Sequence, residues 1–316
     1  MLNTKHYKRA YFHTVIFIVL ALIWSGSFIN IKIAVDLLPP VFSAMMRVLV
    51  SALFLAMFYI IIRKNVFTFS RQTYWVWLTG LFTQALPFGL LFYGEKFIAP
   101  ALASIINSTV ALWALLLGVL IYRDVTSITP LKMIGLILGF TGIVIIFLPL
   151  IHHGENSAIG ILAVMGMAIS YAIGSLMNQH LIFKKNLATF ETNLFQQHIS
   201  SLLFLGATSL ALETWPSWNE FFRTDLLLAF FYLGAISTSL AWMIYFYLIR
   251  EWGAVRTSSV MYIVPLLAML WDFLFLHSIP SANQFVGAAA ILLGVILIQW
   301  SRKSALPLLA PSSETT

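Results

Sequence analysis

Charged residues are scarce in this 316-residue chain. Asp, Glu, Lys and Arg make up 9% of the sequence and hydrophobic residues 60%, whereas a soluble domain carries roughly 25% charged residues. So little charge cannot cover the apolar surface in water, so we expect the chain to lie in lipid. Strands of a membrane barrel alternate apolar and polar residues over about 10 positions. The apolar runs here are continuous and about 20 residues long, as a membrane helix requires. The sequence therefore predicts an all-α integral membrane protein.

Cysteine is absent, which excludes disulfides, thiolate metal sites and cysteine nucleophiles. The phosphate-binding motif G-x-x-x-x-G-K-[ST], the hydrolase motif G-x-S-x-G and the zinc motif H-E-x-x-H are also missing from the sequence. We therefore predict that the protein is not an enzyme and needs no cofactor and no metal.

Ten apolar segments are separated by short connections, and no soluble domain is inserted between them. They lie near residues 12–35, 41–62, 73–94, 101–122, 131–151, 157–177, 191–212, 226–248, 257–277 and 283–300. Lys5, Lys8 and Arg9 precede the first run, as in a signal peptide, but that run is longer than the 7–15 residues of a signal core. We expect a retained first span and a disordered tail at 304–316.

The Lys and Arg residues predict the orientation. If the N-terminus is cytoplasmic, 14 of the 18 basic residues fall in inner segments, whereas only Lys96 and Arg223 fall in outer ones and Lys32 and Arg47 lie within spans. Positive charge is retained on the cytoplasmic side. This asymmetry predicts cytoplasmic N- and C-termini in a plasma (inner) membrane, and it accounts for the net charge of +7 without a nucleic-acid partner.

The second half of the chain repeats the first. With a shift of 154 residues, Gly80 falls on Gly234 and Phe92 on Phe246, and with a shift of 152, Gly142 falls on Gly294. The repeat predicts two five-helix units, residues 1–152 and 153–303. Because five is odd, the two units must lie in the membrane with opposite orientations. Inverted repeats are typical of secondary transporters, whose substrates bind between the repeats near the membrane midplane.

The stretch from Trp24 to Phe28, followed by Lys32, Pro39-Pro40 and Arg47, resembles the start of EamA-type transporters of the drug/metabolite transporter superfamily. The segment from Tyr93 to Ser108 resembles the junction of the third and fourth spans in that family. The resemblance covers nearly the whole chain. It implies a ten-helix bundle with a central cavity, and export or exchange of small metabolites or amino acids. One departure is the missing proline in the fourth span, where Ala111 stands opposite Pro265.

Several polar and aromatic residues within spans are expected to line the cavity. Tryptophan prefers membrane interfaces, so Trp24 near mid-span is a candidate for stacking on substrate, with Tyr171 as its loose counterpart. Asn and Gln satisfy their own helix backbone less readily than Ser and Thr, which favours Gln84 and Asn107 over Ser237, Thr238 and Ser239. The predicted substrate-binding residues are Trp24, Asn30, Gln84, Asn107, Tyr171 and Tyr262. Each of these side chains can alternatively serve only in packing between helices.

A second set of residues is predicted to act in coupling or gating. It comprises Lys32, Arg47, His198, Asp272, Pro87 and Pro265. Lys32 and Arg47 can alternatively extend to the outer headgroups, and Arg47 can pair with Asp36 or hold a substrate carboxylate. Proline frees a backbone carbonyl and bends a helix, so Pro87 and Pro265 are expected to interrupt their spans.

Carboxylates give no clear sign of proton coupling. Glu95 and Glu191 fall at expected helix ends, where hydration or pairing is easy, and no pair of buried carboxylates is apparent near the midplane. A facilitator or an exchanger therefore remains open. His198 can carry a proton, since the pKa of histidine lies near 6.5, or it can be a neutral, hydrogen-bonded structural residue.

The sequence thus predicts a secondary transporter that moves small solutes by alternating access, with helices rocking about Gly26, Pro87 and Pro265. Few fixed charges favour neutral, zwitterionic or amphipathic substrates. The expected partners are a small-molecule substrate and membrane lipids, and the expected assembly is a monomer or a homodimer. The alternative is a membrane-embedded enzyme or an assembly subunit without transport activity.

Overall fold

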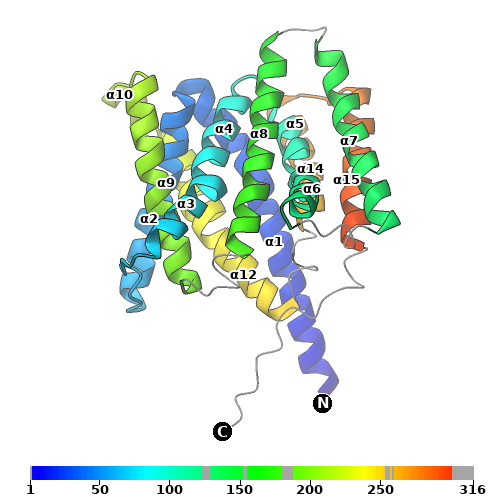
Figure 1. The fold of residues 1–316 in the computed structure, drawn as a ribbon. Coiled ribbons are helices and arrows are strands. Elements are labelled where there is room, and N and C mark those ends of the chain that lie inside the picture. Colours follow the sequence, from blue (N-terminus) through cyan, green and yellow to red (C-terminus); the bar gives the residue numbers. More distant parts are fainter. Residues whose placement is uncertain are drawn as a thin grey trace.

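The computed structural model describes residues 2–122, 129–151, 155–179, 188–252, 257 and 260–300, and these residues form a bundle of helices (Figure 1). In chain order the elements are α1 (Leu2–Leu37), α2 (Pro40–Ile61), α3 (Thr73–Gly80), the π-helical segment η1 (Leu81–Ala85), α4 (Leu86–Glu95), α5 (Pro100–Asn107), α6 (Val110–Tyr122), α7 (Pro130–Ile151), α8 (Glu155–Met177), α9 (Phe190–Leu212), α10 (Trp218–Phe221), α11 (Thr224–Phe231), the π-helical segment η4 (Tyr232–Leu240), α12 (Ala241–Trp252), α14 (Val260–Leu276) and α15 (Ala282–Trp300).

Where the structure describes them, the ten predicted apolar segments lie in helices. Their bounds agree within a few residues, except that α1 begins at Leu2, ten residues before the predicted start, and that the fourth segment is divided between α5 and α6. Six helical runs are long and apolar enough to cross a membrane, and 130–146, 260–276 and 282–298 are shorter apolar helices. The turn between α1 and α2, which contains Pro39, lies at the top of the bundle in Figure 1, and the loop between α2 and α3, which contains Lys64, lies at the bottom. We call these the Pro39 end and the Lys64 end. The predicted tail at 304–316 and the boundary between the two predicted units at 152 and 153 lie outside the described residues.

Two predicted spans are α-helical at both ends and π-helical in the middle. The first consists of α3, η1 and α4, and the second of α11, η4 and α12. Under the shift of 154 residues, η1 falls within η4, so the two π segments occupy equivalent places in the two halves. Pro87 follows η1 directly, in the first turn of α4. π-helical segments occur mostly inside α-helices at functional sites, which draws attention to the level of η1 and η4.

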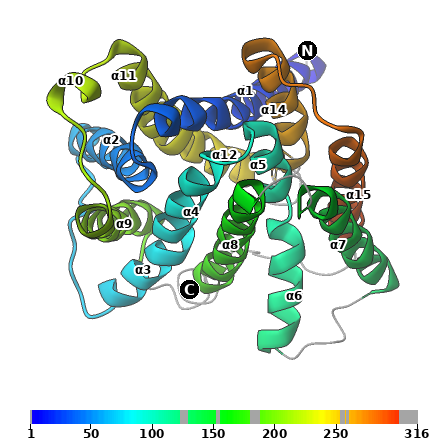
Figure 2. The same ribbon diagram turned by 90° about the horizontal axis from the view of Figure 1, so that it is seen from above.

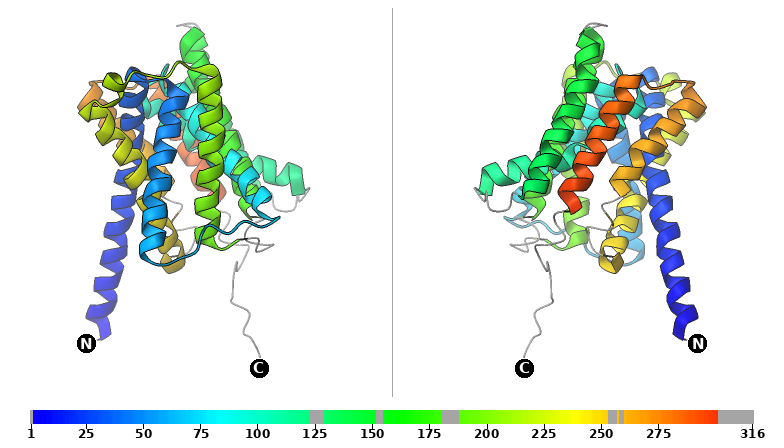
Figure 3. Two further views of the ribbon diagram at one scale, coloured as in Figure 1. Left: turned by 90° about the vertical axis from the view of Figure 1, so that its left-hand side faces the viewer. Right: turned by 90° about the vertical axis from the view of Figure 1, so that its right-hand side faces the viewer.

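The fourth predicted span departs from a single helix, although it lacks the expected proline. α5 ends at Asn107 and α6 begins at Val110. The Ser108 hydroxyl donates to the Ile105 carbonyl at 2.6 Å and the Thr109 hydroxyl to the Ile106 carbonyl at 2.6 Å. Such bonds compete with the helical ladder and bend helices, and α6 leans away from the bundle (Figure 3). By contrast, α14 runs through Pro265 without a break, so the interruption expected there is wrong.

Helices α7 and α15 cross at their glycines, side by side in Figure 2. A Cβ atom on Gly135 would lie 2.6 Å from the carbonyl oxygen of Gly294, and one on Gly142 would lie 2.6 Å from that of Gly287. The two helices are therefore antiparallel. In the repeat, Gly135 corresponds to Gly287 and Gly142 to Gly294. The contact of Gly135 with Gly294 in one pair is therefore equivalent to the contact of Gly287 with Gly142 in the other. These glycines therefore serve in close packing of the two helices.

A second contact between the halves has the same symmetry. A Cβ on Gly80 would meet Gln197 and Ser200 of α9, and a Cβ on Gly234 would meet Arg47 and Val50 of α2. A shift of 150 residues relates Arg47 to Gln197 and Val50 to Ser200. Each half therefore packs its π-containing helix on the other half through a glycine at an equivalent position. The segment η1 faces α9, and η4 faces α2.

Helices α2 and α9 lie side by side and are tied together at both ends (Figure 3). At the Pro39 end, the carboxylate of Glu213 accepts hydrogen bonds from the backbone amides of Val41 and Phe42 at 2.9 and 2.7 Å. At the Lys64 end, the ammonium of Lys64 lies 3.2 Å from the carboxylate of Glu191. A carboxylate at a helix N-terminus satisfies free amides and complements the helix dipole, so Glu213 fixes the start of α2.

Replacing Glu213 by Ala is expected to lower the stability of the protein by about 1–2 kcal/mol, because two amides of α2 lose their acceptor. Thermal unfolding in detergent measures the effect. Glu220→Ala is the control, since Glu220 caps only the one-turn helix α10 through Ser217. Equal melting temperatures for the two variants would contradict the role of Glu213.

Candidate substrate site

The stretch from Trp24 to Gly26 joins α1 to the second half of the chain. The indole of Trp24 donates to the Ser237 carbonyl at 3.2 Å, and the indole of Trp271 donates to the Ser25 hydroxyl at 2.9 Å. A Cβ on Gly26 would lie 2.5 Å from the Tyr232 hydroxyl oxygen. These residues therefore serve as the docking surface of α1 on η4 and α14, at the level of the π segments.

Arg47 is buried between α2, η4 and α4, with 6% of its surface exposed. Its Nε donates to the Thr238 hydroxyl at 2.9 Å and its Nη2 to the Ser237 hydroxyl at 3.5 Å. The guanidinium carbon lies 4.2 Å from the ring centroid of Phe88. Within the described part of the chain no carboxylate lies within 4.0 Å of Arg47, so its buried guanidinium forms no ion pair there, and the carboxyl group of Glu95 acts on it only from a longer distance.

Two sequence-based alternatives for Arg47 are therefore wrong. Arg47 does not extend to the headgroups, since it is buried. It does not pair with Asp36 either, because Asp36 lies 2.8 Å from the ammonium of Lys32, which also donates to the Glu95 carbonyl at 3.2 Å. Lys32, with 22% of its side chain exposed, stays near the Pro39 end.

Gln84 of η1 and His198 of α9 form the second polar element of the site. The side-chain amide of Gln84 lies 3.2 Å from Nδ1 of His198, which lies 2.8 Å from the Leu194 carbonyl. A protonated Nδ1 satisfies that carbonyl and leaves Nε2 as an acceptor. Neither Nε2 of His198 nor Oε1 of Gln84 has a partner among the described residues, although both atoms are buried. Arg47 is close enough to His198 to interact with it electrostatically.

Aromatic rings close the site on two sides. Tyr171 of α8 packs edge-on against Phe88, with 6.4 Å between ring centroids, and interacts electrostatically with Arg47. Trp24 packs against Tyr245, with 5.2 Å between the centroids. The structure thus brings together four of the predicted site residues from four elements: Gln84, Tyr171, His198 and Arg47. Trp24 joins them through Ser237, which both it and Arg47 contact.

Three other predicted residues have different surroundings. The side-chain amide of Asn30 donates to the Gly26 carbonyl within its own helix at 2.8 Å. The Tyr262 hydroxyl donates to the Val295 carbonyl of α15 at 3.4 Å. Asn107, half-buried at the end of α5, has no side-chain hydrogen bond to any described residue. These three do not contact Arg47 through any hydrogen bond or ring contact in the structure.

Phe88, Ser237 and Thr238 belong to the site but were not predicted as site residues. Ser237 and Thr238 were set aside because their hydroxyls can bond their own backbone, and they do donate to the Leu233 carbonyl at 3.1 and 2.6 Å. Their oxygen atoms nevertheless also accept from Arg47. The shift of 154 residues places Gln84 on Thr238. Because Gln84 was predicted to bind substrate, the repeat could have indicated Thr238 as a site residue too.

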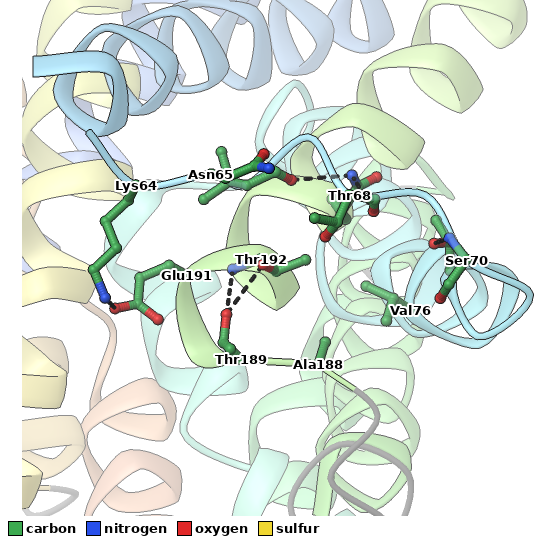
Figure 4. A pocket seen from close by; sticks show the side chains of 12 residues that line it. Lys64, Asn65, Thr68, Ser70, Val76, Ala188, Thr189, Glu191 and Thr192 are labelled. Carbon is green, nitrogen blue, oxygen red and sulfur yellow. Dashed lines mark hydrogen bonds and ion pairs between the residues drawn. The ribbon is translucent and has the colours of Figure 1, made fainter. Parts of the chain in front are cut away.

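Two hollows lie at the two ends of the bundle, above and below the site. The one at the Lys64 end, about 280 Å³ in volume, is lined by the loop after α2 and the start of α9 (Figure 4). Figure 4 shows the ion pair of Lys64 with Glu191 on one side and the Thr189 cap of α9 on another. The other, about 560 Å³, lies at the Pro39 end beside Lys96 and Glu213.

An all-helical bundle with spans of membrane length and a polar site at mid-depth defines a multi-pass membrane protein. The model of the EamA-like transporter family matches residues 13–148 and again 158–300. The chain therefore belongs to the EamA-like transporter family, with two EamA domains, as the resemblance predicted.

Similar proteins are also described as transporters. The chain is 28% identical over 266 residues to an "Uncharacterized transporter in trpA 3'region" of Buchnera aphidicola, covering 84% of this chain and 85% of that protein. It is 27% identical to "Protein PagO" of Salmonella typhimurium, covering 90% and 91%. The transporter YvbV of Bacillus subtilis is 24% identical, with 90% of each chain covered. A crystal structure with 17% identity covers 92% of this chain with a TM-score of 0.60, which shows the shared fold.

Proposed function

We propose that this protein is a secondary transporter, an exporter or exchanger of small metabolites such as amino acids, and that it works by alternating access around Arg47. The supporting observation is a buried guanidinium that forms no ion pair with any described residue, close to two buried acceptor atoms that have no partner among the described residues. Burying an unpaired charge is costly, so such a group in a membrane bundle suits an anionic ligand. Membership of the EamA-like transporter family supports the class of function.

The symmetric contacts support an arrangement of ten membrane-crossing helices in two inverted five-helix units, 1–152 and 153–303. In an inverted repeat, the last helices of the two units are antiparallel and cross at equivalent residues, as α7 and α15 do at their glycines. The bias of basic residues toward the Lys64 end supports a plasma-membrane protein with both termini in the cytoplasm. The Pro39 end is then the outer end.

The polar groups of the site complement an amino acid. Arg47 supplies donors for a carboxylate, and its planar fork suits bidentate binding. Gln84 Oε1 and His198 Nε2 supply acceptors, which suit the N–H groups of an ammonium. Tyr171, Phe88 and Trp24 supply rings for an apolar side chain. We propose that Asn107 and Tyr262 line the path to the site, and that Asn30 reaches it when α1 moves.

The ends of the bundle supply the moving parts of the proposal. Two contacts hold α1 to its neighbours: the Lys32 ammonium donates to the Glu95 carbonyl of α4, and Gly26 docks on Tyr232 of η4. Both contacts join elements that must separate when the Pro39 end opens. Pro87, next to η1, and Pro265, within α14, each remove one backbone hydrogen bond from a helix. We propose that the helices bend there.

A thermal-shift screen of the purified protein against amino acids and related metabolites tests the proposal first, because a ligand of the folded state raises the apparent stability. Proteoliposomes loaded with the compounds that bind then test exchange across the membrane. Exchange that needs the protein supports the proposal. Well-folded protein that exchanges none of a broad pool would favour a function without transport.

Gln84→Leu and Asn107→Leu are expected to reduce exchange more than they reduce expression. A leucine side chain in place of Gln84 cannot accept a hydrogen bond from substrate, and position 107 loses a polar group on the proposed path. Gln72→Leu, in the exposed loop before α3, is the control. Parallel loss of expression and exchange in the two site variants would instead assign both side chains to folding.

A further inference from the structure

Two carboxyl groups are enclosed at the Pro39 end, contrary to the expectation that Glu95 is hydrated or paired at its helix end. Glu95 is the last residue of α4 and is 0% exposed. Asp272, in the last part of α14, is 1% exposed. The two come from different halves of the chain and are near enough to interact electrostatically. The sequence did not reveal this pair, because the two residues are 177 positions apart.

Among the described residues, the carboxyl group of Glu95 has no hydrogen-bond donor. Both of its oxygens are buried, and neither has a partner in the described part of the chain. Oδ2 of Asp272 accepts from the backbone amide of Ala101 at 2.9 Å, whereas Oδ1 has no partner. No ion pair within 4.0 Å joins Glu95 or Asp272 to a cation among the described residues.

The charged groups around Glu95 are few and engaged elsewhere. Lys32 of α1 bonds the backbone carbonyl of Glu95 and pairs with Asp36. Arg47 of α2 donates to hydroxyls of η4. The groups whose charge reaches Glu95 are Asp272 of α14, Lys32 and Asp36 of α1, and Arg47 of α2. Tyr171 is the titratable residue of α8 whose side chain the structure describes, and α5 (Pro100–Asn107) carries no titratable side chain.

A carboxyl group without donors in an apolar interior is held most stably as the neutral acid, because burial of the unpaired charge costs several kcal/mol. We propose that Glu95, together with Asp272, is a proton-binding site that couples transport to proton movement. The coupling to transport rests on the proposed function, whereas the binding of a proton is a property of the folded chain alone.

The position of the pair explains how a proton would affect the structure. Glu95 and Asp272 lie where the two halves meet, and Asp272 also ties α14 to the first turn of α5 through Ala101. Loss of the proton to the aqueous side places like charges at this junction and favours its opening. Asp36, with 52% of its side chain exposed, lies on the other side of Lys32. When the Pro39 end opens, Lys32 can therefore leave its ion pair with Asp36 and form one with the ionised Glu95.

Infrared difference spectroscopy between acidic and alkaline pH detects the protonated carboxyl groups directly in the purified full-length protein. We expect a protonated-carboxyl band that disappears as the pH rises and is missing from Glu95→Gln. Glu220→Gln, in the exposed helix α10, is expected to keep the band. A Glu95→Gln spectrum identical to that of the unmodified protein would overturn the proposal.

Asp272→Asn gives a second test if Glu95→Gln does not fold, since an amide oxygen can still accept from Ala101. Removing the neighbouring charge is expected to shift the pH at which the Glu95 band disappears. An unchanged pH dependence would show that the two groups do not act as a pair, which contradicts the proposal.

Transport separates this inference from the proposed function. In proteoliposomes with pooled radiolabelled amino acids, Glu95→Gln is expected to lose accumulation driven by a pH gradient and to keep exchange at equal pH. Gradient-driven accumulation equal to that of the unmodified protein overturns proton coupling. If the unmodified protein moves none of the pool, the proposed function fails, and the infrared result still decides whether the site binds a proton.

Discussion

Replacing Arg47 by Gln is expected to abolish amino-acid exchange in proteoliposomes and to leave the protein folded. A hydrogen bond to a charged group contributes about 1.5–3 kcal/mol, so losing one guanidinium contact weakens substrate binding roughly 10- to 150-fold. The fold does not depend on the charge, because Arg47 has no carboxylate partner within 4.0 Å among the described residues. Removing a buried, unpaired cation also removes its cost of desolvation.

Two further variants make the Arg47 test specific. Arg47→Lys keeps the charge but lacks the planar fork of donors, so it is expected to retain part of the activity. Arg71→Gln, in the exposed loop before α3, is expected to behave as the unmodified protein. If Arg47→Gln lowers the melting temperature as much as it lowers exchange, Arg47 has a structural role and the substrate site lies elsewhere.

Replacing Gly142 by Ala is expected to destabilise the protein strongly, although Ala favours a helix over Gly by about 1 kcal/mol. The added Cβ would lie 2.6 Å from the Gly287 carbonyl oxygen, and a backbone atom cannot move aside without separating α7 from α15. Overpacking of this kind costs typically about 1–3 kcal/mol. Thermal unfolding in detergent and the yield of monodisperse protein measure the loss.

The internal symmetry sharpens the glycine test. Gly294 is the equivalent of Gly142, and a Cβ there would lie 2.5 Å from the Gly135 carbonyl oxygen. Gly294→Ala is therefore expected to destabilise to the same degree. Gly206→Ala is the control, since its Cβ would meet only the Met45 sulfur, at 3.6 Å. Stability unchanged in Gly142→Ala would contradict the close crossing of the two halves.

The sequence predicted the helices well because lipid imposes a simple rule on them. Each span must be apolar for about 20 residues, so its limits are visible in composition alone. The two π segments were not predicted, since no residue pattern marks them, except that Pro87 follows η1. The break between α5 and α6 was missed for a similar reason. A break was associated with proline, whereas here the Ser108 and Thr109 hydroxyls bond to carbonyls three residues back.

The site was predicted in part, where a polar side chain stands out within an apolar span. Gln84, His198 and Arg47 were noticed for that reason, but not that they lie together. Thr238 and Phe88 carry no such signal, because one is common within membrane helices and the other is apolar. Glu95 was misjudged, since its position at the end of an apolar run indicates exposure. Only the packing of α1, α5 and α8 around that end shows that it is buried.

The central claim is that the site around Arg47 opens in turn to the two faces of the membrane. Because the chain has no cysteine, a single introduced thiol reports on one position without background. In Tyr171→Cys, the thiol is expected to react with a membrane-impermeant reagent in right-side-out vesicles and also in inside-out vesicles. Lys96→Cys, at the outer end, is expected to react only in right-side-out vesicles. Lys64→Cys, at the cytoplasmic end, is expected to react only in inside-out vesicles. A thiol at position 171 that reacts from one side alone, or from neither, would contradict alternating access.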